Sequence, residues 1–357
     1  MKLGDLTVYR HTSAVPVGSC YRAIDFPLSN MTNSGIKKVA VITQHNSRSL
    51  HDHLSSPKWW DLGSKQGGLF VLSPYMTTDN TGWFKGTADS IFQNIQFLRR
   101  SKEEFVVISS GDCVYKMDFT EMVAFHERKN ADITIAYHQV SCSDAIRNYG
   151  VLELDEYERL MDLEEKPLEP QSDLGSIGVY VIKRTMLIDL LETISAEGRY
   201  HLVQDIFARY RKRLRIFGYK FDGYWRNLGS IQAYFDCNMD FLKRELREHL
   251  MIEQPYIKTK PKDEPPAKFN SRAVIKNCLV GSGAILDGNA HRSVIFRRVH
   301  TGENSHVRNA IIMEGTRIGE GCIIEHAILD KDIAIAPGTH VIGKPEQPVI
   351  LSKGTVM

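Results

Sequence analysis

A repeating pattern of small and aliphatic residues near the C-terminal end constrains the possible folds of this chain most strongly. A small residue followed by two aliphatic residues recurs at spacings of 15, 17 and 17 residues, starting at Cys278, Ser293, Ala310 and Ala327. Small residues fit inside the corners of a stacked coil, and aliphatic residues stack along its axis. The pattern therefore predicts a parallel β-helix built from hexapeptide turns, rather than a β-sandwich with regular turns.

The region before this repeat alternates helical and strand patterns, which is typical of an α/β domain. Aliphatic runs predict buried strands at 39–42, 105–108, 133–137 and 216–221. Helical spacing of apolar residues predicts helices across 28–35, 91–98, 187–194, 203–210 and 231–242. Ser230 is the predicted N-cap of the last helix. We also predict a long polar excursion over the surface at 45–82 and a loop at 224–230.

A proline-rich stretch with mixed charge separates the two regions. It contains Pro255, Pro261, Pro265 and Pro266, which is linker composition. We therefore assign 1–248 to the α/β domain, 249–270 to the linker and 271–357 to the β-helix.

The stretch Val-Val-Ile-Ser-Ser-Gly-Asp at 106–112 places a carboxylate directly after a buried strand. In an open α/β sheet, ligands collect at the carboxyl ends of the strands. A carboxylate at this edge can hold Mg²⁺ against phosphate oxygens. Asp112 is therefore a candidate site residue, and a turn-capping role is the alternative.

Composition argues against several classes of function. The formal net charge of the 357 residues is +2, so no bulk charge favours nucleic acid or an anionic membrane. No apolar run approaches the length of a membrane span. The six cysteines are scattered without a C-x-x-C pair, which argues against a zinc site or a disulfide framework. We expect a cytoplasmic protein with reduced thiols and with neither nucleic acid nor a membrane as partner.

Seven short segments occur in the order in which a known enzyme family carries them. They are Tyr21-Arg22-x-Ile24-Asp25-Phe26-x-Leu28-Ser29-Asn30, Ile42-Thr43-Gln44, Gly86-Thr87-Ala88-Asp89, Gly111-Asp112, Glu165-Lys166-Pro167, Gly178-Val179-Tyr180 and Tyr224-Trp225-Arg226. As a set they resemble bacterial glucose-1-phosphate adenylyltransferase, also called ADP-glucose pyrophosphorylase, over nearly the whole chain. The resemblance implies a Rossmann-like (GT-A-like) nucleotidyltransferase domain with a mixed sheet, followed by a left-handed β-helix. It also implies the Mg²⁺-dependent conversion of ATP and glucose 1-phosphate to ADP-glucose and pyrophosphate in glycogen synthesis.

This chain differs from the family's catalysts on the nucleotide side. The catalysts open with a strand and a G-G-x-G-T-R-L loop, whose backbone N–H groups hold the triphosphate; the sequence contains no such loop. A family lysine aligns with Thr12, and the second metal-binding aspartate aligns with Asn227. An amide supplies a neutral carbonyl oxygen where a carboxylate would supply charge. We therefore expect no intact catalytic set and at most a weak metal position at Asp112, with Mg²⁺ supplied through a catalytic partner.

The sugar-phosphate side keeps the family residues. The resemblance implies substrate binding by Asp112, Gly150, Glu165, Lys166 and Ser176. This imbalance is most similar to the GlgD-type regulatory subunit, which assembles with a catalytic homologue. We therefore expect a catalytically weak or inactive subunit in a heterotetramer, or in an oligomer of its own copies, that binds glucose 1-phosphate or a sugar-phosphate effector.

Arginine suits phosphate recognition, which makes several cations candidates for an effector site between the domains. These are Arg22, Lys37, Lys38, Arg297 and Arg298, and solvated surface charge is the alternative reading.

Two other functions are compatible with the same residues. The first is an active adenylyltransferase whose glycine-rich loop lies outside this sequence; the second is a scaffold that only builds the tetramer. The first strand of such a fold is central in the sheet, and its absence would leave an unpaired edge in the core. We therefore expect an N-terminal strand in addition to the sequence given, and an intact loop on it would weaken the case for inactivity.

Overall fold

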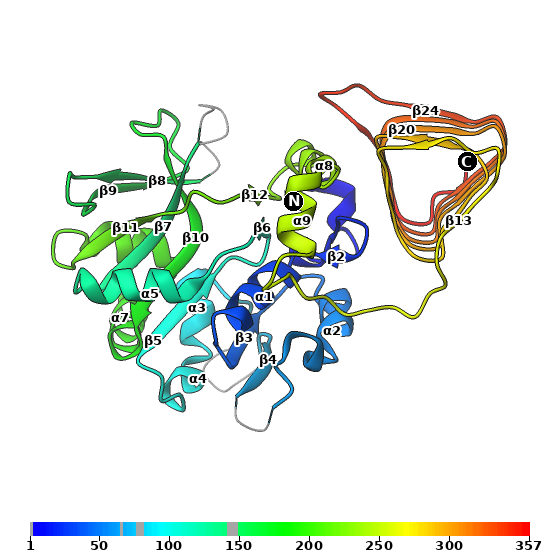
Figure 1. Cartoon of the computed structure of the whole chain (residues 1–357). Helices are drawn as coiled ribbons and strands as arrows, with labels where there is room; N and C mark the ends of the chain where they lie inside the picture. The colour runs from blue at the N-terminus through cyan, green and yellow to red at the C-terminus, as the bar shows by residue number, and fades with distance from the viewer. Residues whose placement is uncertain (1–2, 65–66, 76–81, 141–148) are drawn as a thin grey trace.

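The computed structural model describes residues 3–64, 67–75, 82–140 and 149–357 and shows two domains (Figure 1). An α/β domain carries the layers of helices and strands, and the C-terminal residues form a triangular coil beside it. Helix α9 (Arg244–Met251) ends the first domain, and β13 (Lys268–Phe269) begins the coil. No helix in the described part of the chain is both long and apolar enough to cross a membrane.

The α/β domain is built around a six-stranded mixed sheet with the order β11-β7-β10-β8-β9, in which β5 also pairs with β10. Strands β5 and β7 run antiparallel to β10, while β11 runs parallel to β7. The mixed sheet that the family resemblance implies is thus confirmed. Its strands are β5 (Phe105–Ser109), β7 (Ile133–Gln139), β8 (Gly150–Leu154), β9 (Leu160–Glu165), β10 (Leu174–Lys183) and β11 (Ile216–Lys220).

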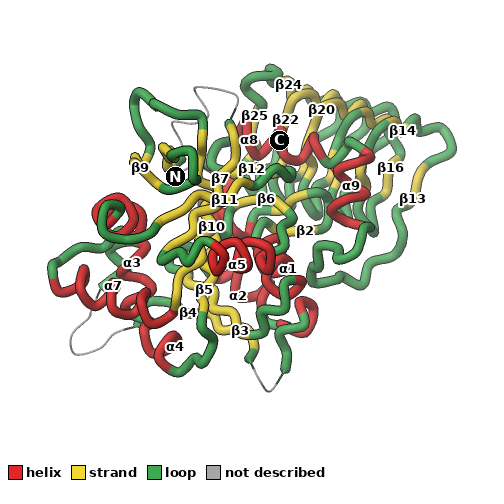
Figure 2. Tube along the Cα trace, turned by 60° about the vertical axis from the view of Figure 1, so that its left-hand side comes forward, coloured by secondary structure: helices red, strands yellow, loops and turns green. Residues whose placement is uncertain are grey.

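Alternating side chains of β10 face two different cores, as the period of a strand requires. Val179 and Val181 pack with Met122 of helix α5 (Phe119–Arg128). Ile182 packs with Leu187 of helix α7 (Arg184–Ala196) on the other face. Helices on both faces therefore bury this sheet, and Figure 2 shows them around its strands. The remaining elements of the domain are η1 (Gly4–Thr7), η2 (Thr12–Ala14), β1 (Pro16–Val17), β2 (Tyr21–Arg22), α1 (Asp25–Asn33), β6 (Cys113–Tyr115), η4 (Val203–Ala208), β12 (Trp225–Asn227) and α8 (Ile231–Asp240).

The prediction of a polar surface excursion at 45–82 is wrong for the residues that the structure describes, and 65–66 and 76–81 lie outside them. This region contains α2 (Arg48–Leu54), η3 (Pro57–Trp60) and β4 (Gly68–Leu72), and β4 pairs in parallel with β3 (Lys38–Ile42). Trp60 is fully buried, whereas its neighbour Trp59 is exposed. A few apolar side chains spaced through a polar stretch are enough to build a core against β3, and sequence periodicity does not reveal such spacing.

Two further local predictions need correction. The single helix predicted across 91–98 is two helices, α3 (Thr87–Phe92) and α4 (Ile95–Arg99). The Asn94 side chain donates to the Ser90 carbonyl at 2.8 Å and competes with the regular helical pattern. The predicted loop at 224–230 contains strand β12, which pairs with β6. Ser230 does cap α8, since its hydroxyl accepts from the Ala233 N–H at 3.1 Å.

The C-terminal domain is a parallel β-helix, as the repeat predicts. Strands stack in parallel on the faces of the coil, with Ile285 beside His300, His300 beside Arg317 and Arg317 beside Ala334. These partners follow one another at 15, 17 and 17 residues, the spacing of the sequence repeat. One sheet contains β13 (Lys268–Phe269), β16 (Ile285–Leu286), β19 (His300–Thr301), β21 (Arg317–Ile318) and β23 (Ala334–Ile335). A second, eight-stranded sheet contains β14 (Ile275–Lys276), β15 (Leu279–Val280), β17 (Asn289–His291), β18 (Val294–Ile295), β20 (His306–Ile312), β22 (Ile323–Leu329), β24 (His340–Ile342) and β25 (Val349–Leu351).

The two domains share a hydrophobic core. Leu6 and Tyr234 of the first domain pack in one cluster with Phe296 and Ile328 of the β-helix. Arg10 and Asp330 form a buried ion pair across this contact, with 2.8 Å between the guanidinium and the carboxylate. The β-helix is therefore docked on the α/β domain by apolar packing and by a buried charge pair.

Candidate functional site

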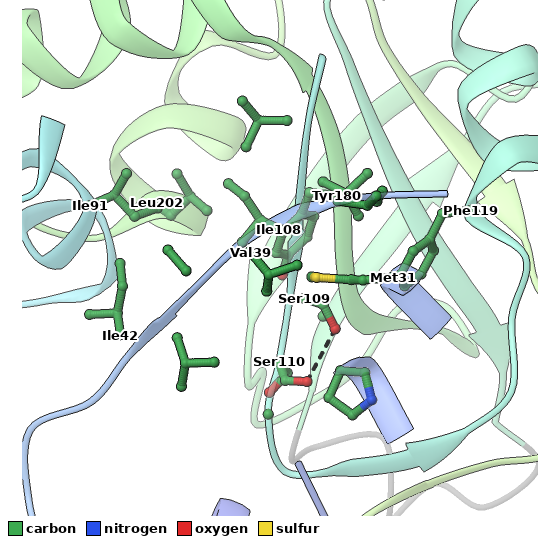
Figure 3. Close-up of a pocket in the computed structure, with 18 of the residues that line it drawn as sticks. Met31, Val39, Ile42, Ile91, Ile108, Ser109, Ser110, Phe119, Tyr180 and Leu202 are labelled. Carbon is green, nitrogen blue, oxygen red and sulfur yellow. Dashed lines mark hydrogen bonds between the residues drawn. The ribbon is translucent and has the colours of Figure 1, made fainter. Parts of the chain in front are cut away.

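Six of the predicted site residues line one cavity of about 1140 Å³ in the α/β domain. Figure 3 shows part of this cavity, with Ser110 and Tyr180 among the residues that line it. Its lining includes Asp112 and Asn227 from the nucleotide side and Gly150, Glu165, Lys166 and Ser176 from the sugar-phosphate side. The cavity reaches inward between β3 and β5, where its lining is mainly apolar. The predicted site residues therefore lie towards the carboxyl end of β5.

Asp112 lies three residues after β5, between that strand and β6. A Cβ atom on Gly111 would lie 2.8 Å from the Ser13 hydroxyl, so only glycine lets the chain pass here without displacing a neighbour. The Ser110 hydroxyl donates to the Asp112 carboxylate at 2.5 Å. The Asp112 carbonyl accepts from the Leu228 N–H at 3.0 Å. These contacts fix the carboxylate at the sheet edge, where the strand pattern placed it.

Asn227 lines the same cavity as Asp112. The antiparallel pairing of β12 with β6 sets Asn227 opposite Cys113, the residue after Asp112. The Asn227 amide donates to the Cys113 sulfur at 3.4 Å. The structure thus brings the two metal positions of the family together, as one carboxylate and one amide. Within the described residues there is no group of three or more His, Cys, Asp or Glu side chains that could hold a metal ion. This pair does not fit a two-carboxylate Mg²⁺ site.

Thr12, the other substituted family position, begins η2 and is partly buried. It is not among the residues that line the cavity, whereas its neighbour His11 is. The His11 ring accepts from the Ser13 N–H at 3.2 Å and so caps η2. Burial lowers the pKa of His11, the charge of Asp112 opposes this shift and His45 adds to it. Sequence analysis assigned no role to His11, because a single histidine in an irregular segment has no diagnostic spacing.

The sugar-phosphate residues come from three adjacent strands. Gly150 of β8 pairs with Glu165 of β9, and a Cβ atom on Gly150 would lie 3.1 Å from the Glu165 carboxylate. Lys166 follows β9 with a positive φ of 53°, and its N–H donates to the Tyr149 carbonyl at 2.9 Å. Its ammonium lies 3.9 Å from the Glu165 carboxylate. The structure therefore brings a cation and a carboxylate together beside a glycine that leaves room for the Glu165 carboxylate.

Ser176 of β10 completes this side of the site. It is buried, and its hydroxyl accepts from the Gly178 N–H at 3.3 Å and lies 3.5 Å from the Tyr180 hydroxyl. Burial raises the pKa of Tyr180 to about 12, so its hydroxyl stays protonated at neutral pH. Hydroxyl groups, a carboxylate and an ammonium are the groups that bind sugar hydroxyls and phosphate oxygens.

Tyr149 connects the two sides of the site and was not predicted. Its ring packs edge-to-face on Trp225 of β12, with 5.0 Å between the ring centroids. Burial raises the pKa of Tyr149 to about 12, and the nearby charges of Cys113 and Asp112 add to this. The signal that could have found it is its position directly before the family's Gly150.

A second polar cluster lies where the β-helix meets the α/β domain. Glu314 accepts from Arg297 and Arg298 and binds the Lys331 ammonium at 3.1 Å. Burial lowers the pKa of Arg22, and the charges of Arg10 and Arg297 lower it further. The predicted effector residues Arg22, Arg297 and Arg298 are therefore near one another.

Lys37 and Lys38 lie elsewhere, at the amino end of β3. The Lys38 ammonium donates to the Ser101 hydroxyl at 2.8 Å and lies above the Phe97 ring. Lys262, Glu314 and Lys331 were not predicted, because only the docking of the β-helix brings these residues near Arg22.

Comparison with known proteins agrees with this architecture. Residues 1–244 match the nucleotidyl transferase family, and residues 265–348 match the GlmU-like C-terminal hexapeptide family. The fold and the site therefore define a member of the nucleotidyl transferase family with a C-terminal hexapeptide domain. The chain is 34% identical over 351 residues to the glucose-1-phosphate adenylyltransferases of Bacillus anthracis, Bacillus thuringiensis subsp. konkukian and Bacillus mycoides. Each match covers 98% of this chain and 93% of the relative. The chain belongs to the glucose-1-phosphate adenylyltransferase family.

Proposed function

We propose that this chain is a regulatory, catalytically weak or inactive subunit of a cytoplasmic ADP-glucose pyrophosphorylase in glycogen biosynthesis. The observation that carries the proposal is that Asn227, an amide at the position of the family's second metal aspartate, pairs with Cys113 and lines the same cavity as Asp112. Nucleotidyl transfer depends mainly on positioning and on neutralisation of charge by metal ions. Replacing one metal carboxylate by an amide removes charge where the reaction needs it, at a cost on the order of several kcal/mol.

The better-preserved sugar-phosphate side supports binding without turnover. Glu165, Lys166 and Ser176 line the same cavity, with the ammonium of Lys166 available to a phosphate oxygen. We propose that glucose 1-phosphate or a related sugar phosphate binds here. Binding at this position would stabilise one arrangement of the subunit, and a ligand shifts an equilibrium only through such differential affinity.

An incomplete metal site favours assembly with a catalytic homologue that supplies Mg²⁺ and carries out the reaction. We propose a heterotetramer with that partner, and the family membership of the chain supports a shared subunit architecture. The partner would contribute its own complete set of metal ligands. This chain would then modify the affinity or the rate of the partner's site.

The cluster at the domain contact supports a second sugar-phosphate position, for an effector. Burial lowers the pKa of Lys262, and the nearby charges of Arg297 and Lys260 lower it further. Burial also lowers the pKa of Lys331, where Glu314 opposes the shift and Arg22 adds to it. Cations that repel one another gain stability from a bound anion, and arginine forks match phosphate geometry.

Co-expression with a catalytic homologue tests the proposal. We expect the two chains to co-purify, the purified chain alone to form little ADP-glucose, and the mixed complex to respond differently to sugar phosphates than the catalyst alone. Turnover by this chain alone at ordinary enzyme rates would instead establish the active-adenylyltransferase alternative. Isothermal titration with glucose 1-phosphate separates regulation from a scaffold, because a pure scaffold binds no sugar phosphate.

A further inference from the structure

The segment between α9 and β13 is fastened to the α/β domain by consecutive residues. The Ile257 side chain is buried in the core that the two domains share. The Lys258 N–H donates to the Ser29 hydroxyl at 2.8 Å, and the Lys260 ammonium donates to a carbonyl of α2 at 3.0 Å. We call residues 256–260 the strap. Figure 1 shows this segment passing along α1 and α2 on its way to the β-helix.

A buried carboxylate holds the middle of the strap. Asp25, the first residue of α1, is completely buried, and its carboxylate accepts from the Thr259 hydroxyl at 2.6 Å and from the Arg22 N–H at 2.8 Å. The ring of His53 from α2 is also buried, and its Nε2 lies 2.6 Å from the other carboxylate oxygen. A buried carboxylate is stable only when such groups satisfy it, so release of Thr259 would leave Asp25 with one partner fewer. The fastening of the strap and the environment of Asp25 are therefore linked.

The β-helix holds the other end of the same segment. Glu264 lies 3.5 Å from the guanidinium of Arg298. Lys262 lies between this contact and the strap, two residues after the strap ends. Burial lowers the pKa of Lys262, and the charge of Arg297 lowers it further, so Lys262 belongs to the cations of the domain contact. The two anchors therefore set the position of Lys262 within that cationic cluster.

Helix α1 also holds the strand that follows Asp112. Asn30 of α1 is buried, its amide donates to the Tyr115 carbonyl at 3.2 Å, and its side-chain oxygen accepts from the Met117 N–H at 3.2 Å. Tyr115 ends β6, which begins directly after Asp112 and pairs with β12. A movement of α1 at the strap would therefore reach β6 through contiguous hydrogen-bonded groups.

We propose that Thr259 and the Asp25–His53 pair are positioning residues, which couple anion binding at the domain contact to the cavity. An anion that binds Lys262 and its neighbouring cations would hold the segment between its two anchors and favour the fastened strap. The fastened strap would hold α1, and α1 would hold β6 beside the cavity. This coupling rests on the effector cluster of the proposed function and adds how that cluster acts on the site.

Hydrogen exchange of the 357-residue protein without ligands tests the fastening. Thr259→Val removes the hydroxyl and keeps the branched shape. We expect about tenfold faster amide exchange at 256–260 and 113–117 in this variant, the factor for loss of one hydrogen bond to a charged group. Thr259→Ser keeps a hydroxyl and should restore the exchange rates of the parent. Exchange at 179–182, in the middle of the mixed sheet, should be the same in all three proteins.

Three results would overturn the coupling. Unchanged exchange rates at 256–260 would show that Thr259 does not fasten the strap. Faster exchange at 256–260 alone would show that α1 does not transmit the change to β6. Equally faster exchange at 179–182 would show a general loss of stability instead of a local release.

Inorganic phosphate then tests the connection to the effector cluster. With millimolar phosphate, we expect slower exchange of the parent at 256–260 and 113–117. The response at 113–117 should be lost in Lys262→Met and in Thr259→Val, and it should persist in Lys166→Met, which removes the cation of the cavity. Phosphate binding that leaves exchange at 113–117 unchanged would overturn the coupling. No phosphate binding in isothermal titration would instead overturn the effector cluster, while the first experiment would still decide the fastening.

Discussion

Asn227 is the residue that most clearly separates this chain from a two-carboxylate catalyst. In the Asn227→Asp variant, a second carboxylate would lie beside Asp112, because β12 holds position 227 opposite Cys113. We expect this variant to be less stable than the parent without Mg²⁺, since two like charges then share one site. Millimolar Mg²⁺ should raise its melting temperature by about 2–4 °C, the effect of about 1 kcal/mol of ligand stabilisation.

Thermal melts with and without Mg²⁺ provide the measurement. Asn227→Ala is the matched control, because it removes the amide without adding charge. A Mg²⁺ response of the parent protein equal to that of Asn227→Asp would show that one carboxylate already suffices, and would weaken the proposal of a subunit without its own metal site.

Lys166 is the cation that we assign to the phosphate of the sugar ligand. Lys166→Met should weaken glucose 1-phosphate binding by about tenfold or more, because hydrogen bonds to charged groups contribute about 1.5–3 kcal/mol. Lys183→Met is the control, since Lys183 ends β10 and its side chain is as exposed as that of Lys166, at 52% for both. Isothermal titration compares the two variants. Equal affinities would place the phosphate elsewhere.

At the scale of elements, short strands and caps position the site more than long helices do. Strand β12 has three residues, yet its pairing with β6 brings Asn227 to Asp112 and Trp225 to Tyr149. Helix α8 follows directly and packs its buried face into the core shared with the β-helix. The start of α8 therefore influences both the site and the domain contact.

The Ser230 cap of α8 can be tested separately from the chemistry of the site. Ser230→Ala removes the acceptor for the Ala233 N–H and should lower the free energy of unfolding by about 1 kcal/mol. Thr193→Ala in α7 is the control, because that exposed hydroxyl bonds only to the Asp189 carbonyl of its own helix. Its effect should stay within about 0.5 kcal/mol in urea titrations. A Ser230→Ala effect as small as this would show that packing alone sets the start of α8.

At the scale of the whole molecule, Glu314 couples the stability of the domain contact to pH. Burial alone would raise its pKa, but hydrogen bonds and charges from Arg297 and Lys331 outweigh burial and hold the pKa at about 2. Because this folded-state pKa lies below the usual 4.5, the stabilisation is fully present above pH 4.5 and is lost as the pH falls towards 2. It amounts at most to about 3 kcal/mol.

Urea midpoints at pH 7, 4.5 and 3 measure this coupling. Glu314→Gln should be destabilised at pH 7 and should lose less stability than the parent between pH 4.5 and 3. Glu303→Gln changes an exposed glutamate of the same domain and is the control. Its stability should change with pH as that of the parent does. If the stability of Glu314→Gln has the same pH dependence as that of the parent, the Glu314 carboxylate does not stabilise the domain contact through Arg297 and Lys331.

Sequence patterns predicted the structural elements that depend on neighbouring residues in the chain. The repeat near the C-terminus predicted the β-helix, because its small and aliphatic residues recur once per coil. Aliphatic runs located β5, β7 and β11 of the mixed sheet. The same reasoning failed at 45–82, where the buried Trp60 and strand β4 follow no regular period. Periodicity detects an element only when most of its residues share one environment.

The class of each domain, the cap of α8 and the identity of the altered residues Thr12 and Asn227 can all be read from the order of the amino acids. The order of the amino acids does not show which of these residues come close together, and only the tertiary structure does. Folding placed Asn227 beside Asp112, left Thr12 outside the cavity lining, brought Arg22 to Arg297 and left Lys38 apart. The physical reason is that strand pairing and domain docking join residues more than 100 positions apart, and no local pattern records such contacts.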